Sequence, residues 1–212
     1  MNTDELHIVF NKIKPEIDKR LKSFEQIRNT AGQKELFIEL AFCLLTPQSG
    51  ARRCWTAIEK LLDKNLLFDG TAAEISDELN IVRFRNNKAS YIVEARKKFL
   101  DGQNSLRELL DSETSIQEKR IRLVRDVKGY GMKEASHFLR NTGFGQDIAI
   151  LDRHILRNME RFGLIEKIPA SITGKKYIEL EQILSGFSSK TGIPMQYMDF
   201  ILWYKETGDI FK

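Results

Sequence analysis

The sequence of 212 residues lacks the features that mark several classes of protein. It has no run of 18 or more apolar residues, and its N-terminal stretch MNTDELHIVF is acidic and amphipathic, so we expect neither a membrane-spanning helix nor a signal peptide. Proline is scarce, with four residues, and 42% of the chain is hydrophobic. This composition predicts a soluble globular protein that buries a substantial core, rather than a disordered chain.

Cysteine is equally scarce. The two cysteines, Cys43 and Cys54, lie eleven residues apart in apolar surroundings and form no Cys-x-x-Cys pair. Free, buried thiols are therefore expected rather than metal ligands, and no metal site is predicted. This use of cysteine favours a cytoplasmic location.

Charge of one sign does not dominate the chain. Lys and Arg number 34 and Asp and Glu 30, which gives a net charge of +4 at pH 7. A mildly basic protein can approach phosphates, but many basic proteins bind no nucleic acid. The charge therefore leaves nucleic-acid binding open without deciding it.

Apolar residues recur with a helical period along most of the chain. The clearest case places five of them at positions i, i+3, i+4, i+7 and i+8 of one helix, namely Phe37, Leu40, Ala41, Leu44 and Leu45. No stretch alternates with a period of two residues and pairs with another such stretch. We therefore expect nine or ten helices, essentially no sheet, and the all-α class.

Two further expectations concern single helices. Residues 4 to 13 form an amphipathic pattern that Pro15 is expected to interrupt, because proline lacks an N–H and clashes with the preceding turn. The segment from 114 to 125 predicts a helix with Ile121 and Val124 turned inward.

The stretch from 127 to 154 carries the residues that point most directly to chemistry. Gly129 and Gly131 lie two residues apart, between helices expected at 114–126 and 132–141. Glycine adopts positive φ and lets another backbone come close. A tight turn at this place can therefore offer backbone N–H groups to an anion at the start of the next helix.

A lysine and a carboxylate follow this turn. Lys133 lies just inside the second helix, and Asp152 lies nineteen residues farther on, at the start of another expected helix. Taken alone, an acid in that position is most often a helix cap. Together with a lysine beside a turn that can grip phosphate, it suggests chemistry on nucleic acid.

The segment VKGYGMK at 127–133, followed by Asp152, resembles the helix-hairpin-helix superfamily of base-excision DNA glycosylases over nearly the whole chain. Three more segments match that superfamily: LLTPQS at 44–49, RFRNNKA at 83–89 and AILDRHI at 149–155. More narrowly, the sequence is similar to the archaeal-type second family of 8-oxoguanine DNA glycosylases through the segments KGYGMKEASHFLRN, DIAILDRHILR and WYKETGDIFK.

The resemblance implies a compact all-α fold of two helical lobes with a DNA cleft between them. Within a single glycosylase unit, residues 34–141 would form the middle lobe with the helix-hairpin-helix, and residues 1–33 with 145–212 the flanking lobe. Many helix-hairpin-helix glycosylases for other lesions carry four C-terminal cysteines that bind an iron–sulfur cluster, whereas this chain has none after Cys54. No iron–sulfur cluster and no required cofactor are therefore expected.

The resemblance also implies a bifunctional DNA glycosylase/AP lyase that excises 8-oxoguanine. Its nucleophile would be Lys133, whose neutral amine attacks the sugar C1′; the resulting imine permits β-elimination of the 3′ phosphate and strand cleavage. An apolar helix and the positive end of its dipole would lower the pKa of Lys133, because both disfavour the protonated amine. Asp152 would take its proton or stabilise the positive charge that develops on the sugar.

Five residues are candidates for DNA contacts. Gly129 and Gly131 would hold the DNA backbone through N–H groups, and Lys128 would contact phosphate or nothing. The resemblance implies a monovalent cation bound by carbonyls of this hairpin. Gln48 resembles the glutamine that fills the hole left by the flipped base, and Phe84 occupies the position of the wedge side chain. The plainer interpretations of these two are a polar loop residue and an aromatic that packs at a helix start.

Three residues are candidates for recognising the flipped purine. His137 lies four residues past Lys133, one helical turn along the same face, although a lone histidine is more often part of a core. The resemblance places the C-terminal lysine and a nearby tryptophan in the base pocket, which here are Lys212 and Trp203. Without it, Trp203 would be assigned to the core and Lys212 to a frayed end.

The expected partner is double-stranded DNA containing 8-oxoguanine, bound by a monomer with no membrane partner. Such an enzyme would act on the nucleoid in the cytoplasm of a prokaryote. Two alternatives stay open. One is the same chemistry on oxidised pyrimidines or bare abasic sites, and the other is a non-catalytic helix-hairpin-helix module that only grips DNA.

Overall fold

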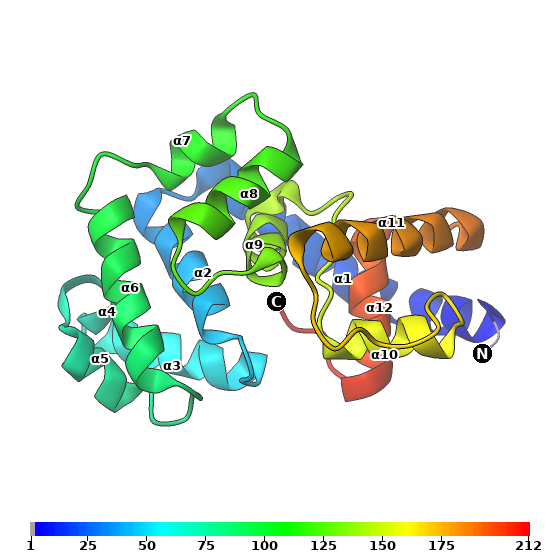
Figure 1. Cartoon of the computed structure of the whole chain (residues 1–212), viewed down its shortest axis with the longest axis horizontal. Helices are drawn as coiled ribbons and strands as arrows, with labels where there is room; N and C mark the ends of the chain where they lie inside the picture. The colour runs from blue at the N-terminus through cyan, green and yellow to red at the C-terminus, as the bar shows by residue number, and fades with distance from the viewer. Residues whose placement is uncertain (1–2) are drawn as a thin grey trace.

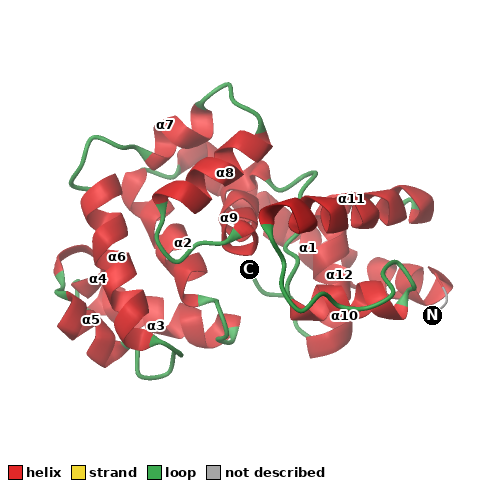
Figure 2. Cartoon of the chain, in the orientation of Figure 1, coloured by secondary structure: helices red, strands yellow, loops and turns green. Residues whose placement is uncertain are grey.

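The computed structural model describes residues 3–212, and every regular element in this range is a helix (Figures 1 and 2). The predicted all-α class is thus confirmed. No helix within these residues is both long enough and apolar enough to cross a bilayer. The elements are α1 (Thr3–Thr30), α2 (Gln33–Leu45), α3 (Ala51–Asp63), α4 (Leu66–Asp69), α5 (Ala72–Glu78), α6 (Arg85–Phe99), α7 (Leu106–Asp111), α8 (Ile116–Asp126), α9 (Met132–Leu139), the π-helix η1 (Arg140–Phe144), α10 (Arg153–Arg161), α11 (Gly174–Thr191) and α12 (Met195–Thr207).

These twelve α-helices exceed the nine or ten expected because several are short. The helix α4 has only four residues, too few to show a periodic pattern. Local caps start other short helices. At α5, the Thr71 hydroxyl accepts the Glu74 N–H at 3.3 Å, and the Glu74 carboxylate accepts the Thr71 N–H at 2.8 Å.

The predicted break at Pro15 is wrong, because α1 runs through it without interruption. Proline removes one N–H and leaves the carbonyl of Asn11 without its helical partner, but both residues are exposed and water can reach that carbonyl. Leu6, Ile13 and Ile17 are buried on both sides of the proline. Tertiary packing of this apolar face therefore outweighs the cost of one lost hydrogen bond.

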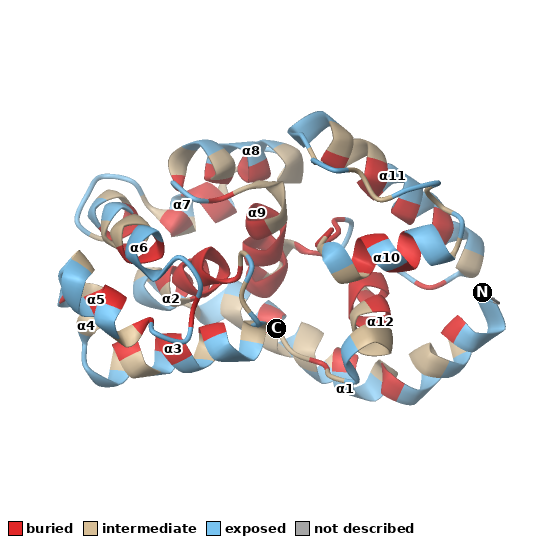
Figure 3. Cartoon of the chain, turned by 60° about the horizontal axis from the view of Figure 1, so that its bottom comes forward, coloured by how far each residue is buried: buried red, intermediate tan, exposed pale blue. Residues whose placement is uncertain are grey.

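The buried hydrophobic side chains form two clusters. The first is drawn from residues 36–148 and the second from residues 6–24 and 149–210. In Figure 1 the helices α2 to α8 lie on one side and α1, α10, α11 and α12 on the other. The helix α9 lies between the two groups and is mostly buried (Figure 3). A residue on α9 can therefore face the junction of the two groups.

The inward face of α8 differs from the expected one. Ile121 is 55% exposed and Val124 is half-buried, whereas Arg120 is fully buried. Arg120 donates two hydrogen bonds of 2.7 Å to the Glu181 carboxylate on α11, which also accepts the Ala149 N–H at 2.8 Å. This paired charge takes the inside position and turns Ile121 toward solvent. It also ties the hairpin to the second group of helices.

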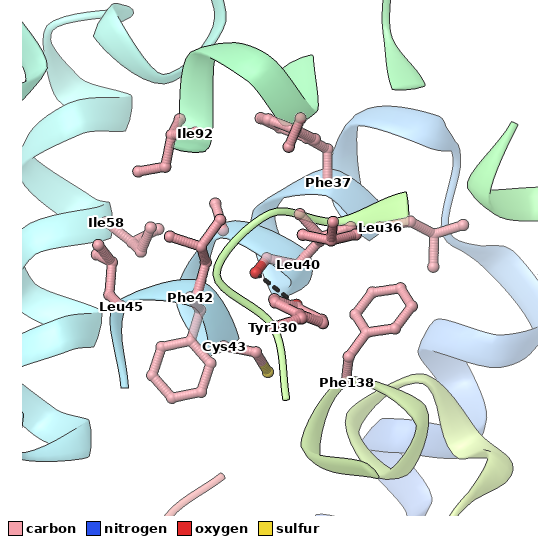
Figure 4. Close-up of a cluster of buried hydrophobic side chains, with 14 of the residues drawn as sticks. Leu36, Phe37, Leu40, Phe42, Cys43, Leu45, Ile58, Ile92, Tyr130 and Phe138 are labelled. Atoms are coloured by element: carbon pink, nitrogen blue, oxygen red, sulfur yellow. Dashed lines mark hydrogen bonds between the residues drawn. The ribbon is translucent and has the colours of Figure 1, made fainter. Parts of the chain in front are cut away.

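The hairpin between α8 and α9 turns at Gly129, whose φ is +90°. A side chain there would also collide with the ring of Tyr91, since a Cβ would lie 2.5 Å from it. Gly131 has an extended backbone that any residue adopts, so only one of the two glycines serves as the expected left-handed turn. Between them, Tyr130 enters the first cluster and donates a hydrogen bond of 2.8 Å to the Leu40 carbonyl (Figure 4).

Candidate active site

A cavity of about 530 Å³ opens where the two groups of helices meet. It is lined by the corner after α2, by α9, by the start of α10, by α12 and by the last residues of the chain. Six of the residues singled out in the sequence line it: Gln48, Lys133, His137, Asp152, Trp203 and Lys212. Phe84, Lys128, Gly129 and Gly131 lie outside its wall.

Lys133 projects into the cavity from the first turn of α9. Its side chain is 22% exposed and forms part of the cavity wall. The amine donates a hydrogen bond of 2.8 Å to Thr46 Oγ1 and lies 3.6 Å from Glu134 Oε1. Glu134 in turn accepts the Gly131 N–H at 3.1 Å. Sequence reasoning missed both Thr46 and Glu134.

Asp152 caps α10 and also lines the cavity. Its Oδ1 accepts the N–H groups of His154 at 2.8 Å and Ile155 at 2.9 Å, so the plain interpretation as a cap is correct for that oxygen. Within residues 3–212, Oδ2 has no hydrogen bond and no ion pair with Lys133. The carboxylate and the amine thus face one cavity without contacting each other.

Lys128 is the rival lysine, and its surroundings differ. Its amine bonds Glu94 at 2.9 Å, lies 5.4 Å from the centre of the Tyr91 ring, and its side chain is 60% exposed. The hydrogen bond that Lys128 donates to the Glu94 carboxylate raises the pKa of Lys128. This lysine is held on the surface by a carboxylate, outside the cavity wall.

Gln48 and Phe84 occupy two neighbouring corners. The Ser49 hydroxyl accepts the Arg83 N–H at 3.1 Å and so joins the corners to each other. Gln48 has φ +54° and Phe84 has φ +59°, which is the left-handed backbone conformation that favours glycine. Within residues 3–212, Asn65 is the third non-glycine residue with a positive φ. Such a conformation costs on the order of 1 kcal/mol and is concentrated at functional sites. Phe84 is 57% exposed, which contradicts a packed aromatic.

A buried lysine that the sequence did not single out holds the first of these corners. Lys88 on α6 donates to the carbonyls of Leu45 at 2.7 Å and Pro47 at 2.8 Å, and to the Ser49 hydroxyl at 3.2 Å. Burial lowers the pKa of Lys88 to about 8. The match of RFRNNKA to the glycosylase corner was the only sequence signal for this residue.

The low pKa of Lys88 predicts a pH-dependent stability. Between pH of about 8 and 10.5 the unfolded chain keeps a proton on Lys88 that the folded chain has lost, so folding is favoured as pH rises. The wild type should therefore gain about 1 to 2 kcal/mol of unfolding free energy over that range relative to Lys88→Met, allowing for solvent screening. Urea unfolding of both proteins at several pH values measures this gain.

Lys97→Met is the matched control, because Lys97 is exposed on the same helix. This variant keeps Lys88, so its stability should still rise over the same interval. If the difference in unfolding free energy between wild type and Lys88→Met does not change with pH, burial does not lower the pKa of Lys88.

His137 lies on the cavity wall between aromatic and charged neighbours. Its side chain is 5% exposed and its ring packs edge-on against Phe42 at 5.4 Å. Burial, with Arg140 and Lys133 nearby, holds the pKa of His137 well below its usual value. Neither ring nitrogen has a well-oriented hydrogen-bond partner among residues 3–212, although the Lys212 backbone is close enough to favour protonation. A neutral ring there offers one donor and one acceptor.

Trp203 and a buried ion pair complete the opposite wall. Trp203 is half-buried and packs edge-on against His154, with 4.7 Å between ring centres, so it is not a fully enclosed core residue. Arg140 and Asp199 form an ion pair of 2.8 Å, and the guanidinium lies 4.5 Å from the centre of the Phe200 ring. Burial raises the pKa of Asp199, and the charge of Arg140 opposes that rise. Sequence reasoning singled out neither charged residue, although Arg140 lies in the matched segment KGYGMKEASHFLRN.

The end of the chain is docked between the two groups of helices, where Figure 1 marks it. The Lys212 amine forms an ion pair of 2.5 Å with the buried Glu39 and lies 3.3 Å from the centre of the Trp55 ring. Asp209 accepts hydrogen bonds from Arg52 on α3. Lys212 is therefore not a frayed end, and burial lowers the pKa of its amine.

A family model described as 8-oxoguanine DNA glycosylase matches residues 17–193. The chain belongs to the 8-oxoguanine DNA glycosylase family. A relative named 8-oxoguanine DNA glycosylase/AP lyase, from Fusobacterium nucleatum, is 43% identical over 99% of this chain and 97% of that protein. A relative of the same name from Methanocaldococcus jannaschii is 35% identical over 95% of this chain and 94% of that protein.

Solved structures of this glycosylase family agree with the fold. The 8-oxoguanine DNA glycosylase of Thermotoga maritima matches with a TM-score of 0.88 at 34% identity, covering 99% of this chain and 98% of that one. The M. jannaschii 8-oxoguanine glycosylase/lyase, in complex with a 15mer DNA containing 8-oxoguanine, matches with a TM-score of 0.89 at 32% identity over 99% of both chains. The family predicted from the sequence motifs is confirmed.

Proposed function

We propose that this protein excises 8-oxoguanine from double-stranded DNA and then cleaves the strand, with Lys133 as its nucleophile. The observation that carries the proposal is that Lys133 and Asp152 line one cavity of about 530 Å³. A cavity of this size accommodates a flipped nucleotide. The relatives named 8-oxoguanine DNA glycosylase/AP lyase support both activities.

The two steps use one amine. The neutral Lys133 nitrogen attacks C1′, the bond from C1′ to the base breaks, and the base leaves with the bonding electrons and takes up a proton. Loss of a proton from the nitrogen and opening of the sugar ring give an imine. Removal of a proton from C2′ then breaks the bond from C3′ to the phosphate oxygen, which cuts the strand. Asp152 stabilises the positive charge that develops on the sugar.

Gln48 on the cavity wall and the residues outside the cavity suit a role on the rest of the duplex. Gln48 would fill the hole left by the flipped nucleotide, and the exposed Phe84 would separate the neighbouring bases. Lys128 and Gly129 would contact phosphate, since both are exposed. The Gly131 N–H already donates to the Glu134 carboxylate. A phosphate that accepts from this N–H would therefore share the hydrogen with Glu134 or displace the carboxylate.

The hairpin would also hold the predicted monovalent cation through backbone carbonyls. The chain folds back on itself there, since the Tyr130 N–H donates to the Val127 carbonyl at 3.1 Å. Within residues 3–212 no three His, Cys, Asp or Glu side chains cluster in a way that could hold a metal ion. The carbonyls of the hairpin are the ligands that we propose for this cation, and the proposed reaction requires no other cofactor.

Three wall residues would read the base. The ring of Trp203 offers a stacking surface, and the neutral His137 offers a donor and an acceptor for the purine edge. Lys212 closes the same wall from the end of the chain. We propose action as a monomer, on chromosomal DNA in the cytoplasm.

Excision from duplexes that contain a panel of oxidised bases, each opposite all four partners, tests the proposal. We expect 8-oxoguanine to be released fastest and the strand to be cut at the same site, and borohydride to trap a covalent complex. Faster release of an oxidised pyrimidine would favour the first alternative substrate class. Tight binding without a trapped adduct on any lesion would identify a module that only grips DNA.

A further inference from the structure

The hydroxyl of Thr46 is the hydrogen-bond acceptor of Lys133. The Lys133 amine donates to Thr46 Oγ1 at 2.8 Å, and the Thr46 hydroxyl donates its own hydrogen to the Cys43 carbonyl at 2.8 Å. Since that hydrogen is committed to the backbone of α2, the oxygen presents its lone pair to the lysine. Glu134 lies farther from the amine, at 3.6 Å.

Thr46 is also fixed in place. It is 7% exposed and directly follows α2, whose residues from Leu36 to Leu45 are almost all in the first cluster. Lys88 bonds the carbonyls on either side of it, those of Leu45 and Pro47. The acceptor is thus held by the core and by a buried lysine, while Lys133 stands on another helix 87 residues away in sequence.

We propose that Thr46 is a positioning residue for the nucleophile. A lysine side chain has four rotatable bonds, and one anchored N–H selects the orientation in which the nitrogen lone pair can face the sugar carbon. The role rests on the proposed function, in which Lys133 attacks DNA. The corner at residues 45–49 would then have two roles, because it contains both Gln48 and the residue that positions Lys133.

Thr46→Val and Thr46→Ser form the matched pair that separates the hydroxyl from the rest of the side chain. Valine keeps the shape and removes the acceptor, whereas serine keeps the acceptor and removes a methyl group. Under single-turnover conditions, Thr46→Val should slow release of 8-oxoguanine and borohydride trapping by about 10- to 100-fold. Thr46→Ser should stay within about threefold of wild type, because its hydroxyl can make both hydrogen bonds.

Binding to a duplex that contains a tetrahydrofuran abasic analogue supplies the second measurement. This analogue cannot form an imine, so its affinity reports DNA binding alone, and both variants should bind within about twofold of wild type. Trapping by Thr46→Val at the wild-type rate would overturn the inference. So would equal slowing by both variants, because the methyl group rather than the acceptor would then matter.

Thermal unfolding of each variant shows whether the variant is folded. If Thr46→Val does not fold, Thr46→Ala is compared with Thr46→Ser in its place, with the same expected contrast. Failure of the proposed function looks different, because wild type itself would then give no trapped complex. Trapping by wild type that Lys133→Gln abolishes, with Thr46→Val unaffected, would reject only the positioning role.

Discussion

Replacing Lys133 by glutamine should lower the rate of trapped-complex formation with 8-oxoguanine DNA by at least about 10³-fold. The reason is that the amide nitrogen of glutamine cannot form an imine at C1′. Lys88 still bonds the carbonyls of Leu45 and Pro47 in this variant, so the corner and the cavity wall should persist. Affinity for the tetrahydrofuran duplex should therefore stay within about threefold of wild type, since the lost group acts in the reaction.

Lys128→Gln is the matched control for the loss of a lysine. Lys128 lies five residues earlier, at the hairpin, and pairs with Glu94 outside the cavity. Its replacement should weaken binding mildly, make binding less dependent on salt, and leave trapping at saturating enzyme unchanged. Trapping that survives Lys133→Gln but disappears with Lys128→Gln would reverse the assignment of the nucleophile.

Asp152→Asn should slow release of the base in a single turnover by about 10²- to 10³-fold. The substitution removes the negative charge that faces the developing positive charge on the sugar. It keeps an oxygen that can cap α10, because asparagine caps a helix about as well as aspartate. The hydrogen bonds from His154 and Ile155 can therefore remain, and stability and DNA binding should change little.

Two comparison variants separate the effect of the Asp152 charge from the loss of a helix cap and from the charge of Glu134. Ser115→Ala removes the cap of α8, which does not line the cavity, and should cost about 1 kcal/mol in stability without slowing the reaction. Glu134→Gln removes the carboxylate nearest to the Lys133 amine. An unchanged rate for Asp152→Asn would return Asp152 to its role as a cap, and a large loss in Glu134→Gln alone would move the electrostatic role to Glu134.

Short-range patterns in the sequence were enough to predict the helical class and the main chemical residues. The spacing of Leu40, Leu44 and their neighbours predicts a buried helix because 3.6 residues make one turn, and α2 has that face. The hairpin, Lys133 and Asp152 lie in one segment of 28 residues, from 127 to 154, so the motif can be recognised in the sequence without knowledge of any tertiary contact. The motif match then predicted the family, which the comparisons confirm.

The tertiary structure decided which charged groups are buried and what they contact. Arg120 displaces Ile121 from the interior because Glu181, 61 residues away, supplies its partner. The burial of a charge depends on such a partner, and local periodicity contains no record of it. Pro15 inside α1 is a similar case, because tertiary packing of the apolar face on both sides of the proline outweighs its local preference.

The surroundings of the reacting lysine belong to this second kind of information. The sequence by itself determined that a lysine follows a glycine hairpin and that a carboxylate starts a later helix. Only the tertiary structure placed Thr46 against the amine and Lys88 behind the corner, and docked Lys212 on Glu39. These pairs join residues from 41 to 173 positions apart, so they arise only when the helices pack. That packing sets where the amine stands relative to the cavity.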